Sequence, residues 1–251
     1  MEQSGFVERG DDVRLAWSRC AGAMPTVVFL PGFRSDMQGV KALALRDRCV
    51  ARGQAMLRLD YSGHGESGAT FDQGTIGRWA EDAWLVIEAQ AAGPVLLVGS
   101  SMGGWIALLL AARLGARLHG LIGIAAAPDF TETLMWQSMT PQEQTRLMTD
   151  GRISVPSEHG SPTVVTRALI EDGRRQQVLG APIPLTCPVR LLQGQLDADV
   201  PWETALKLAA TITGDDVQCV LVKDGDHRLS RPGDIALLLR SLDALLVKDA
   251  A

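Results

Sequence analysis

A serine flanked by glycines stands between an apolar run and a helical pattern. Ser101 is the central residue of the run 99–103 (Gly-Ser-Ser-Met-Gly), with Val-Leu-Leu-Val at 95–98 before it and a helical composition at 105–113 after it. A strand, a Gly-x-Ser-x-Gly turn and a helix in this order form a nucleophile elbow, which exposes the serine hydroxyl at a helix N-terminus. The pattern predicts acyl transfer through a serine ester. The alternative is a glycine-rich turn of a nucleotide-binding sheet or a surface loop.

A serine nucleophile needs a base, and the chain has four histidines. His227 follows an apolar run at 217–222, and parallel sheets hold their chemistry at the carboxyl ends of their strands. We therefore expect His227 to take the serine proton. His64 lies in a glycine-rich loop at the same end and is expected to shape that loop. His119, at the entry of a strand, and His159 are expected to be packing or surface residues.

The acid that orients the base is expected between the serine and the histidine in chain order. Asp197 and Asp199 both follow the apolar run 189–192. Asp197 lies where the loop has just left the strand, so we favour it. Asp199 is nearer the next helix, where it would form loop hydrogen bonds or cap the helix. Asp226 is a weaker rival, because the side chains of adjacent residues such as Asp226 and His227 generally diverge.

Two backbone N–H groups are needed to stabilise the oxyanion of a tetrahedral intermediate. The first is expected from Met102, the residue after the serine. The second is expected from Phe33, in the loop that follows the run 26–30. An ordinary Pro-Gly turn at 31–32 is the simpler alternative. Arg34, next in this loop, would contact a polar group of the substrate or be solvated.

The elements that must position these residues alternate between strands and helices. A sheet with this alternation is mostly parallel and covered by helices on both faces, so the fold class is α/β. Its first element is an antiparallel hairpin, expected from alternating residues at 6–9 and 13–17. The expected inner strands are 26–30, 55–59, 95–98, 121–126, 189–192 and 217–222, and the expected helices are 41–52, 76–91, 105–113, 203–212 and 235–246.

One stretch interrupts the alternation. Between Pro128 and Pro188 the sequence shows no inner strand, and it is too long for a plain connection. We expect residues 128–187 to form an inserted cap above the strand ends, and residues 1–127 and 188–251 to form the core. Met135, Trp136 and Met139 would either line an acyl pocket or pack the cap on the body, and both readings stay open.

Composition excludes several classes of protein. The 251 residues are 46% hydrophobic and carry a net charge of -5, which disfavours a nucleic-acid partner. No apolar run is long enough to span a membrane. The four cysteines form no CxxC pair, so neither a metal nor a redox motif is expected. The acidic start shows no signal or transit peptide, and a cytoplasmic location is expected.

Several stretches together resemble the α/β-hydrolase superfamily over essentially the whole chain. Within it, residues 30–33, 41–44, 60–63, 98–105, 187–192, 197–202 and 226–228 resemble the group that contains the mitochondrial palmitoyl-protein thioesterase, which also acts as an acyl-glucuronide esterase, and its bacterial relatives. The resemblance implies an α/β-hydrolase fold and a Ser101–Asp197–His227 triad, with Phe33 and Met102 as oxyanion donors. It also implies S-acyl thioesters or activated acyl esters as substrates.

The residues and the resemblance together favour a serine esterase or thioesterase. It would act on a small-molecule or S-acylated substrate as a monomer or homodimer, with no cofactor and no metal. A peptidase or an acyltransferase on the same triad is the first alternative. A binding module that has lost catalysis is the second, although such proteins usually lack one member of the triad.

Overall fold

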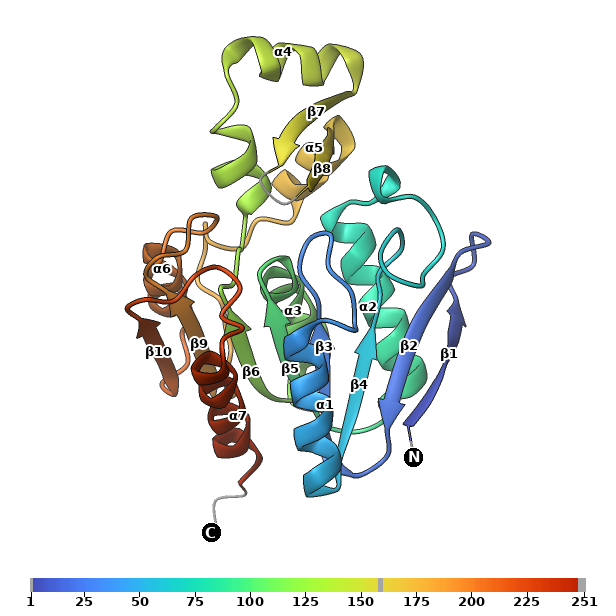
Figure 1. Ribbon diagram of the computed structural model, residues 1–251, viewed down its shortest axis with the longest axis vertical. Coiled ribbons are helices and arrows are strands. Elements are labelled where there is room, and N and C mark those ends of the chain that lie inside the picture. Colours follow the sequence, from blue (N-terminus) through green and yellow to red (C-terminus); the bar gives the residue numbers. More distant parts are fainter. Residues whose placement is uncertain (1, 158–159, 248–251) are drawn as a thin grey trace.

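The computed structural model describes residues 2–157 and 160–247. Within these ranges the centre of the molecule is a sheet of eight strands in the order β1-β2-β4-β3-β5-β6-β9-β10 (Figure 1). The hairpin β1–β2 and the pair β2–β4 are antiparallel, and the remaining pairs are parallel. The strands are β1 (Glu2–Glu8), β2 (Arg14–Cys20), β3 (Ala23–Leu30), β4 (Gln54–Leu59), β5 (Val95–Ser100), β6 (Leu118–Ile124), β9 (Val189–Gly194) and β10 (Val217–Val222).

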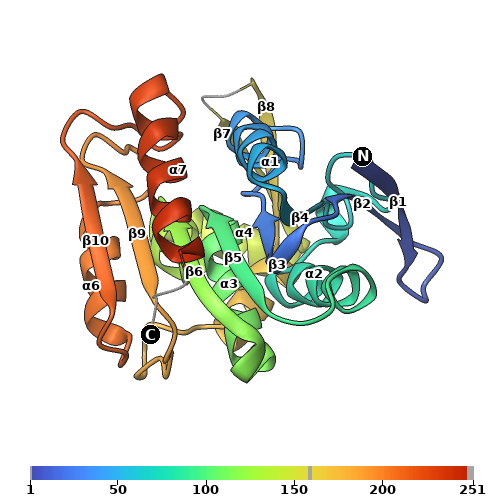
Figure 2. The same ribbon diagram turned by 90° about the horizontal axis from the view of Figure 1, so that it is seen from below.

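Helices cover both faces of this sheet (Figure 2). On one face lie α1 (Val40–Arg52) and α7 (Pro232–Leu246), and on the other lie α2 (Ile76–Gln90), α3 (Met102–Leu114) and α6 (Glu203–Thr211). The expected α/β class, with its mostly parallel sheet and N-terminal hairpin, is confirmed. None of the helices in the described ranges combines the length and the apolar character needed to cross a membrane.

The inner strands are continuously apolar because each faces a core on both sides. Along β3, Val28 and Leu30 pack with α2 and α3, whereas Val27 and Phe29 pack with α1 and α7. Side chains alternate between the two faces of a strand, so burial on both faces removes the polar half of the usual alternation. The sheet is therefore packed on both faces, and the loops that follow its parallel strands start from its carboxyl-terminal edge.

A second layer stands above that edge, inserted between β6 and β9 (Figure 1). It consists of the π-helix η3 (Thr131–Trp136), α4 (Pro141–Asp150), the hairpin of β7 (Arg152–Ser157) and β8 (Gly160–Thr166), and α5 (Arg167–Arg175). Its small core contains Leu147, Ile153, Val165 and Ile170. Short 3-10 turns at η1 (Phe71–Gln73) and η2 (Gly115–Arg117) complete the described elements.

The two ends of this inserted segment are tied together at its base. The buried carboxylate of Asp129 accepts the N–H groups of Val178 and Leu179 at 2.8 and 2.9 Å. These residues pack against the larger core, as do Ile183 and Leu185. The chain after α5 therefore returns to the body of the molecule well before β9 begins.

Candidate active site

Ser101 occupies a strained turn between β5 and α3. Its φ of 53° is unusual for a residue other than glycine, and such strain persists only where the surroundings enforce it. The turn is crowded on both sides: a Cβ at Gly99 would lie 2.2 Å from the carbonyl oxygen of Gly103, and one at Gly103 would lie 2.0 Å from that of Leu30. Glycines are therefore required at both positions for the strand and the helix to approach each other.

The structure brings Ser101, His227 and Asp197 into one hydrogen-bonded line. His227 Nε2 lies 3.1 Å from Ser101 Oγ, and His227 Nδ1 lies 2.8 Å from Asp197 Oδ2. A carboxylate only accepts hydrogen bonds, so Nδ1 carries the proton and Nε2 is left to accept from the serine hydroxyl. The side chain of Asp197 is fully buried, whereas that of His227 is 24% exposed. The histidine thus faces the solvent side of the site and the acid lies behind it.

Asp197 is held as an anion by its neighbours. Its Oδ1 accepts the N–H groups of Asp199 and Val200 at 2.9 and 2.8 Å, and its Oδ2 also accepts from Gln193 Nε2 at 2.8 Å. Burial alone would raise the pKa of Asp197, but the hydrogen bonds from His227 and Val200 outweigh it and the pKa lies below its usual value. The carboxylate of Asp197 is therefore ionised at neutral pH.

The rival acids have other contacts. Asp199 is exposed, and its carboxylate lies within 4.8 Å of the ligating atoms of Asp197 and His227 without forming the bond to the imidazole. Asp226 Oδ1 accepts the N–H of Leu229 at 2.9 Å. Proximity alone would not separate Asp197 from Asp199, but the hydrogen bond to His227 does.

The remaining histidines lie elsewhere. His119 is in β6, and its Nε2 contacts the carbonyl oxygen of Leu245 at 3.0 Å. His64 is buried in the loop after β4, with 4% exposure. His159 lies outside the described residues.

The loop that carries His227 is fastened to the start of α1. Lys41 Nζ donates to the carbonyl oxygen of Arg228 at 2.5 Å and to Ser230 Oγ at 3.4 Å. Burial lowers the pKa of Lys41 to about 8, partly offset by the nearby carboxylate of Asp226. The two bonds fix the backbone next to the imidazole.

Two backbone N–H groups flank the serine. Met102 is the first residue of α3, and the N–H at this position has no acceptor within its own helix. Phe33 lies in a turn closed by a 3.1 Å bond from the N–H of Ser35 to the carbonyl oxygen of Gly32. A Cβ at Gly32 would lie 3.4 Å from the Cβ of Ser101, so this turn passes directly over the serine.

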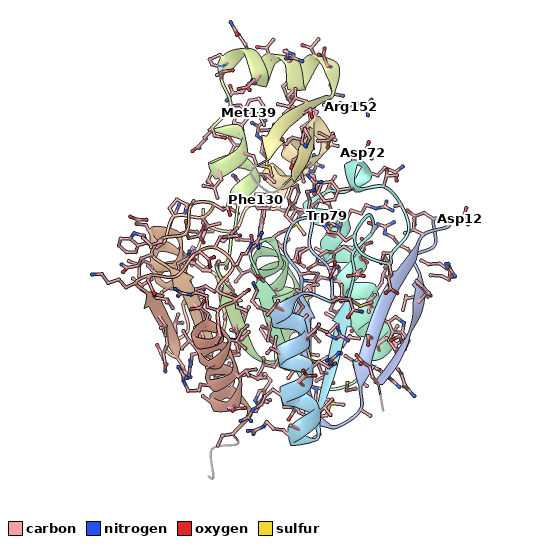
Figure 3. The ribbon with its side chains drawn as sticks, viewed as in Figure 1. Asp12, Asp72, Trp79, Phe130, Met139 and Arg152 are labelled. Atoms are coloured by element: carbon pink, nitrogen blue, oxygen red, sulfur yellow. The ribbon has the colours of Figure 1, made fainter. Side chains whose placement is uncertain are left out.

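A cleft of about 970 Å³ opens at Ser101 between the sheet edge and the inserted layer. Three of the residues proposed from sequence as substrate contacts, Arg34, Met135 and Met139, line this cleft. Figure 3 shows Met139 in the upper layer and Phe130 where that layer joins the core. Trp136 packs instead with the small core of the inserted layer, under the guanidinium of Arg174 at 4.4 Å. The other apolar lining residues include Phe29, Phe33, Val40, Ala127, Leu134, Val155, Val165 and Val200.

Sequence reasoning did not identify Gln193 and Tyr61 as parts of this site. Gln193 contacts Asp197, and the hydroxyl of Tyr61 donates to the carbonyl oxygen of Pro31 at 3.2 Å. Gln193 is a fully buried amide at the end of an apolar strand, and such a residue must find polar partners. This irregularity was the signal in the sequence. The contact between Tyr61 and Pro31 depends on tertiary structure, and nothing in the sequence indicates it.

The chain is similar in sequence and in fold to several known proteins. The family described as serine aminopeptidase S33 matches residues 23–169. Palmitoyl-protein thioesterase ABHD10, mitochondrial, of Mus musculus is 37% identical over 245 residues, covering 97% of this chain and 82% of that protein. The structure of a hydrolase from Agrobacterium vitis S4 is similar with a TM-score of 0.93 and 43% identity, covering 98% and 99% of the two chains. That of mouse α/β-hydrolase domain-containing protein 10 has a TM-score of 0.90 and 36% identity, covering 97% and 98%.

The expected cytoplasmic location is wrong on this comparison, since the mouse relative is named a mitochondrial protein. The expectation depended on the lack of a recognisable targeting pattern in the first residues.

The expectations of fold and enzyme class are confirmed by the match to the family model and by the relatives that cover nearly all of the chain. The expected resemblance to the α/β-hydrolase superfamily and its palmitoyl-protein thioesterase group is confirmed as well. The chain is a hydrolase with the α/β-hydrolase fold, and it belongs to the serine aminopeptidase S33 family.

Proposed function

We propose that the protein is a serine hydrolase that cleaves acyl thioesters or carboxyl esters through a Ser101–His227–Asp197 triad. The observation that carries the proposal is the continuous hydrogen-bonded line from Ser101 Oγ through both imidazole nitrogens to a buried carboxylate. This arrangement supplies a nucleophile, a base and a group that holds the base in the required tautomer. The name of the mouse relative supports a thioester substrate.

In the first half of the reaction, His227 Nε2 removes the hydroxyl proton of Ser101 while Oγ attacks the acyl carbon. The N–H groups of Met102 and Phe33 donate to the oxyanion, and the positive end of α3 adds to its stabilisation. His227 then gives its proton to the leaving sulfur or oxygen, and the acyl group remains on Ser101 as an ester.

In the second half, water takes the place of the leaving group. His227 removes a proton from the water, the resulting hydroxide attacks the acyl carbon, and a second oxyanion forms at the same two N–H groups. Its collapse returns the proton from His227 to Ser101 Oγ and releases the carboxylic acid. Asp197 stays ionised throughout and stabilises the imidazolium in both halves.

The apolar lining of the cleft favours a substrate whose larger part is an acyl chain. Most of its upper lining is apolar: Phe130, Leu134, Met135 and Met139 come from the inserted segment, and Val200 comes from the body. We propose that residues 128–187 act as a cap that selects the acyl chain. Methionines suit this role, because their flexible side chains adapt to chains of different shape.

The test uses a fluorophosphonate probe on the wild-type protein and on Ser101→Ala. Short and long acyl thioesters and the matching oxygen esters are then compared as substrates, together with an aminoacyl amide to detect a peptidase and a nucleophilic acceptor to detect acyl transfer. We expect labelling and hydrolysis by the wild type and neither by Ser101→Ala.

The outcomes separate the alternatives. Failure of the probe to label the wild type contradicts a serine hydrolase. Hydrolysis of oxygen esters without thioesters removes the thioesterase assignment, and preferred cleavage of the amide shows that the peptidase alternative is correct.

A further inference from the structure

His64 is a buried histidine that the proposed reaction does not use. It lies in the loop after β4, between Gly63 and Gly65, whose φ angles of 74° and 48° only glycine adopts readily. Its ring is surrounded by the edges and faces of Tyr61, Phe71 and Trp79, with centroids 5.1 to 5.6 Å away. A rigid aromatic setting of this kind fixes the direction of both ring nitrogens.

The partners of His64 determine its tautomer. Nδ1 lies 3.2 Å from the carbonyl oxygen of Ser62, and Nε2 lies 3.2 Å from the backbone N of Arg34. A carbonyl only accepts and an amide N–H only donates, so Nδ1 carries the hydrogen and Nε2 is the acceptor. Burial lowers the pKa of His64 to about 4, against the opposing effect of the Ser62 bond, and the ring is neutral at physiological pH.

Arg34 is the residue that follows Phe33, and its backbone is strained. It occupies the third position of the turn closed by Gly32 and Ser35, with φ at 58°. Glycine is the usual residue at such a position, and a side chain there costs about 1–2 kcal/mol. The imidazole supplies an acceptor for the N–H that this unusual conformation presents.

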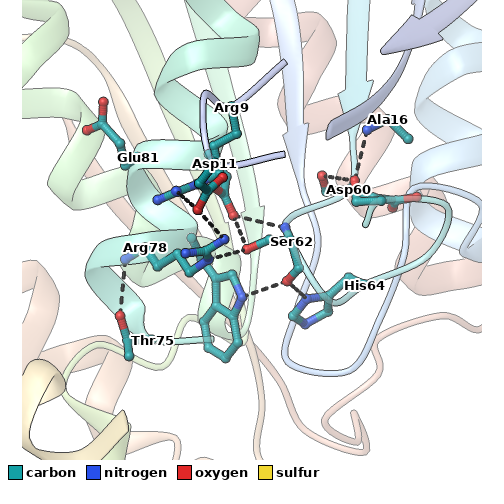
Figure 4. Close-up of polar contacts among 12 residues, drawn as sticks. Arg9, Asp11, Ala16, Asp60, Ser62, His64, Thr75, Arg78 and Glu81 are labelled. Carbon is teal, nitrogen blue, oxygen red and sulfur yellow. Dashed lines mark hydrogen bonds and ion pairs between the residues drawn. The ribbon is translucent and has the colours of Figure 1, made fainter. Parts of the chain in front are cut away.

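The turn is also held on its other side. The Tyr61 hydroxyl donates to the carbonyl oxygen of Pro31, so residues from one loop bond the chain on both sides of Phe33. That loop is anchored to the core: the fully buried carboxylate of Asp82 accepts from Ser62 N and Ser62 Oγ at 2.9 and 2.6 Å and pairs with Arg9. Figure 4 shows Arg9, Ser62 and His64 in this network of polar contacts. A continuous series of polar contacts therefore connects Arg9, through Asp82, Ser62 and His64, to the backbone of Arg34.

We propose that His64 is a positioning residue, which aims the Phe33 N–H at the oxyanion by holding the next peptide unit, at Arg34, through its Nε2 acceptor. The inference rests on the proposed function, in which Phe33 is the second oxyanion donor. His64 does not touch the reacting atoms. Its effect is on the geometry of the donor, and therefore on the transition state more than on the bound substrate.

Two substitutions separate the two nitrogens of His64. In His64→Gln the amide oxygen reaches the place of Nε2 and keeps an acceptor for Arg34. In His64→Asn the shorter amide reaches only the place of Nδ1 and keeps the bond to Ser62. We expect kcat to fall by about 10- to 100-fold in His64→Asn, with KM little changed. This loss is smaller than that caused by removing an oxyanion donor outright, because the Phe33 N–H is still present but is less well aimed. We expect His64→Gln to stay within about fivefold of the wild type.

His119→Gln is the matched control, since it removes a histidine at the opposite end of the sheet and leaves kcat unchanged. The melting temperature of each variant is measured beside its kinetics. If kcat follows the melting temperature across the variants, or if His64→Asn is as active as His64→Gln, the role of His64 is only structural and the proposal is wrong.

A second measurement does not require turnover. Nitrogen-15 NMR of the imidazole of the wild type is expected to show a protonated Nδ1 and a bare Nε2 for His64, with the Arg34 amide shifted in His64→Asn and restored in His64→Gln. The opposite tautomer overturns the inference even if the enzyme is active. A wild type that hydrolyses no acyl substrate contradicts the proposed function instead, while the NMR result still decides whether His64 holds Arg34.

Discussion

Replacing Asp197 by asparagine tests the triad without changing the shape of the site. Every neighbour of this carboxylate is a donor: the N–H groups of Asp199 and Val200 face Oδ1, and Gln193 Nε2 and His227 Nδ1 face Oδ2. An asparagine has only one acceptor oxygen. If that oxygen serves the two backbone N–H groups, its NH2 group faces His227 and drives the imidazole into the tautomer with Nε2 protonated, which cannot accept from Ser101.

The expected cost follows from the loss of the base. A triad with the wrong tautomer loses roughly 10³- to 10⁴-fold in kcat, which corresponds to about 4–5.5 kcal/mol of transition-state stabilisation. The assay compares kcat and KM for an acyl thioester and an oxygen ester in the wild type, Asp197→Asn and Asp199→Asn. Asp199→Asn keeps the backbone N–H that contacts Asp197, so it should lose less than about threefold. If Asp199→Asn loses the larger share, Asp199 is the orienting acid and the geometric argument fails.

Three further predictions concern the cleft, the elbow and the loop of the base. Met139→Ala should lower kcat/KM for long acyl chains by about 3- to 10-fold and leave acetyl substrates unaffected, whereas Trp136→Ala should lower the melting temperature without changing chain-length preference. Gly103→Ala should destabilise the fold by about 3 kcal/mol or more in chemical denaturation, because its Cβ would lie 2.0 Å from the carbonyl oxygen of Leu30. The folded chain binds the Lys41 proton less tightly than the unfolded chain, because burial lowers the pKa of Lys41 to about 8. The free energy of unfolding of the wild type, relative to that of Lys41→Met, should therefore rise with pH between about 8 and 10.5. If the difference between the two free energies does not change over this interval, the burial argument is wrong.

The elements of the core could be predicted from sequence because their signals are local. The doubly buried strands appear as apolar runs. The expected inner strand at 217–222 has the bounds of β10, but its place in the sheet was predicted wrongly: β10 is the edge strand and is only partly buried. The helix after Ser101 was expected at 105–113 but begins at Met102, because glycines at 103 and 104 hide the first turn of a helix. These glycines are present for a tertiary reason, the close approach of α3 to its neighbours.

The inserted layer was less predictable because its contacts are not local. The run 164–170 has the composition of one segment, yet the chain changes from β8 to α5 at Thr166, whose side chain accepts the N–H of Leu169. Trp136 and Met139 lie in one short stretch, but η3 ends between them and only the methionine reaches the cleft. Met139 packs against the small core of the layer as Trp136 does, so composition alone could not show which of the two also lines the cleft.

The order of the site residues in the chain was predictable, whereas the supports behind them were not. Ser101, Asp197 and His227 each follow one of the parallel strands β5, β9 and β10, so their meeting at one end of the strands follows from a parallel sheet. Gln193, Tyr61 and other supports meet the site only through tertiary packing. The amide of Gln193 at the end of an apolar strand signals that a polar partner is needed, but the sequence does not identify that partner, and Tyr61 is an ordinary loop residue when read in sequence.

The two proposed oxyanion donors differ in what holds them, and this difference decides where we expect the site to be vulnerable. Met102 N–H is aimed by α3 itself, whose hydrogen bonds and packing with the sheet fix the first turn. The Phe33 N–H comes from a turn with a strained third residue, and this turn keeps its shape through bonds from Tyr61 and His64 in another loop. Substitutions far from Ser101 in the chain, in the loop after β4, should therefore impair one donor and spare the other. The triad would stay intact, and the loss would appear in kcat more than in the stability of the fold.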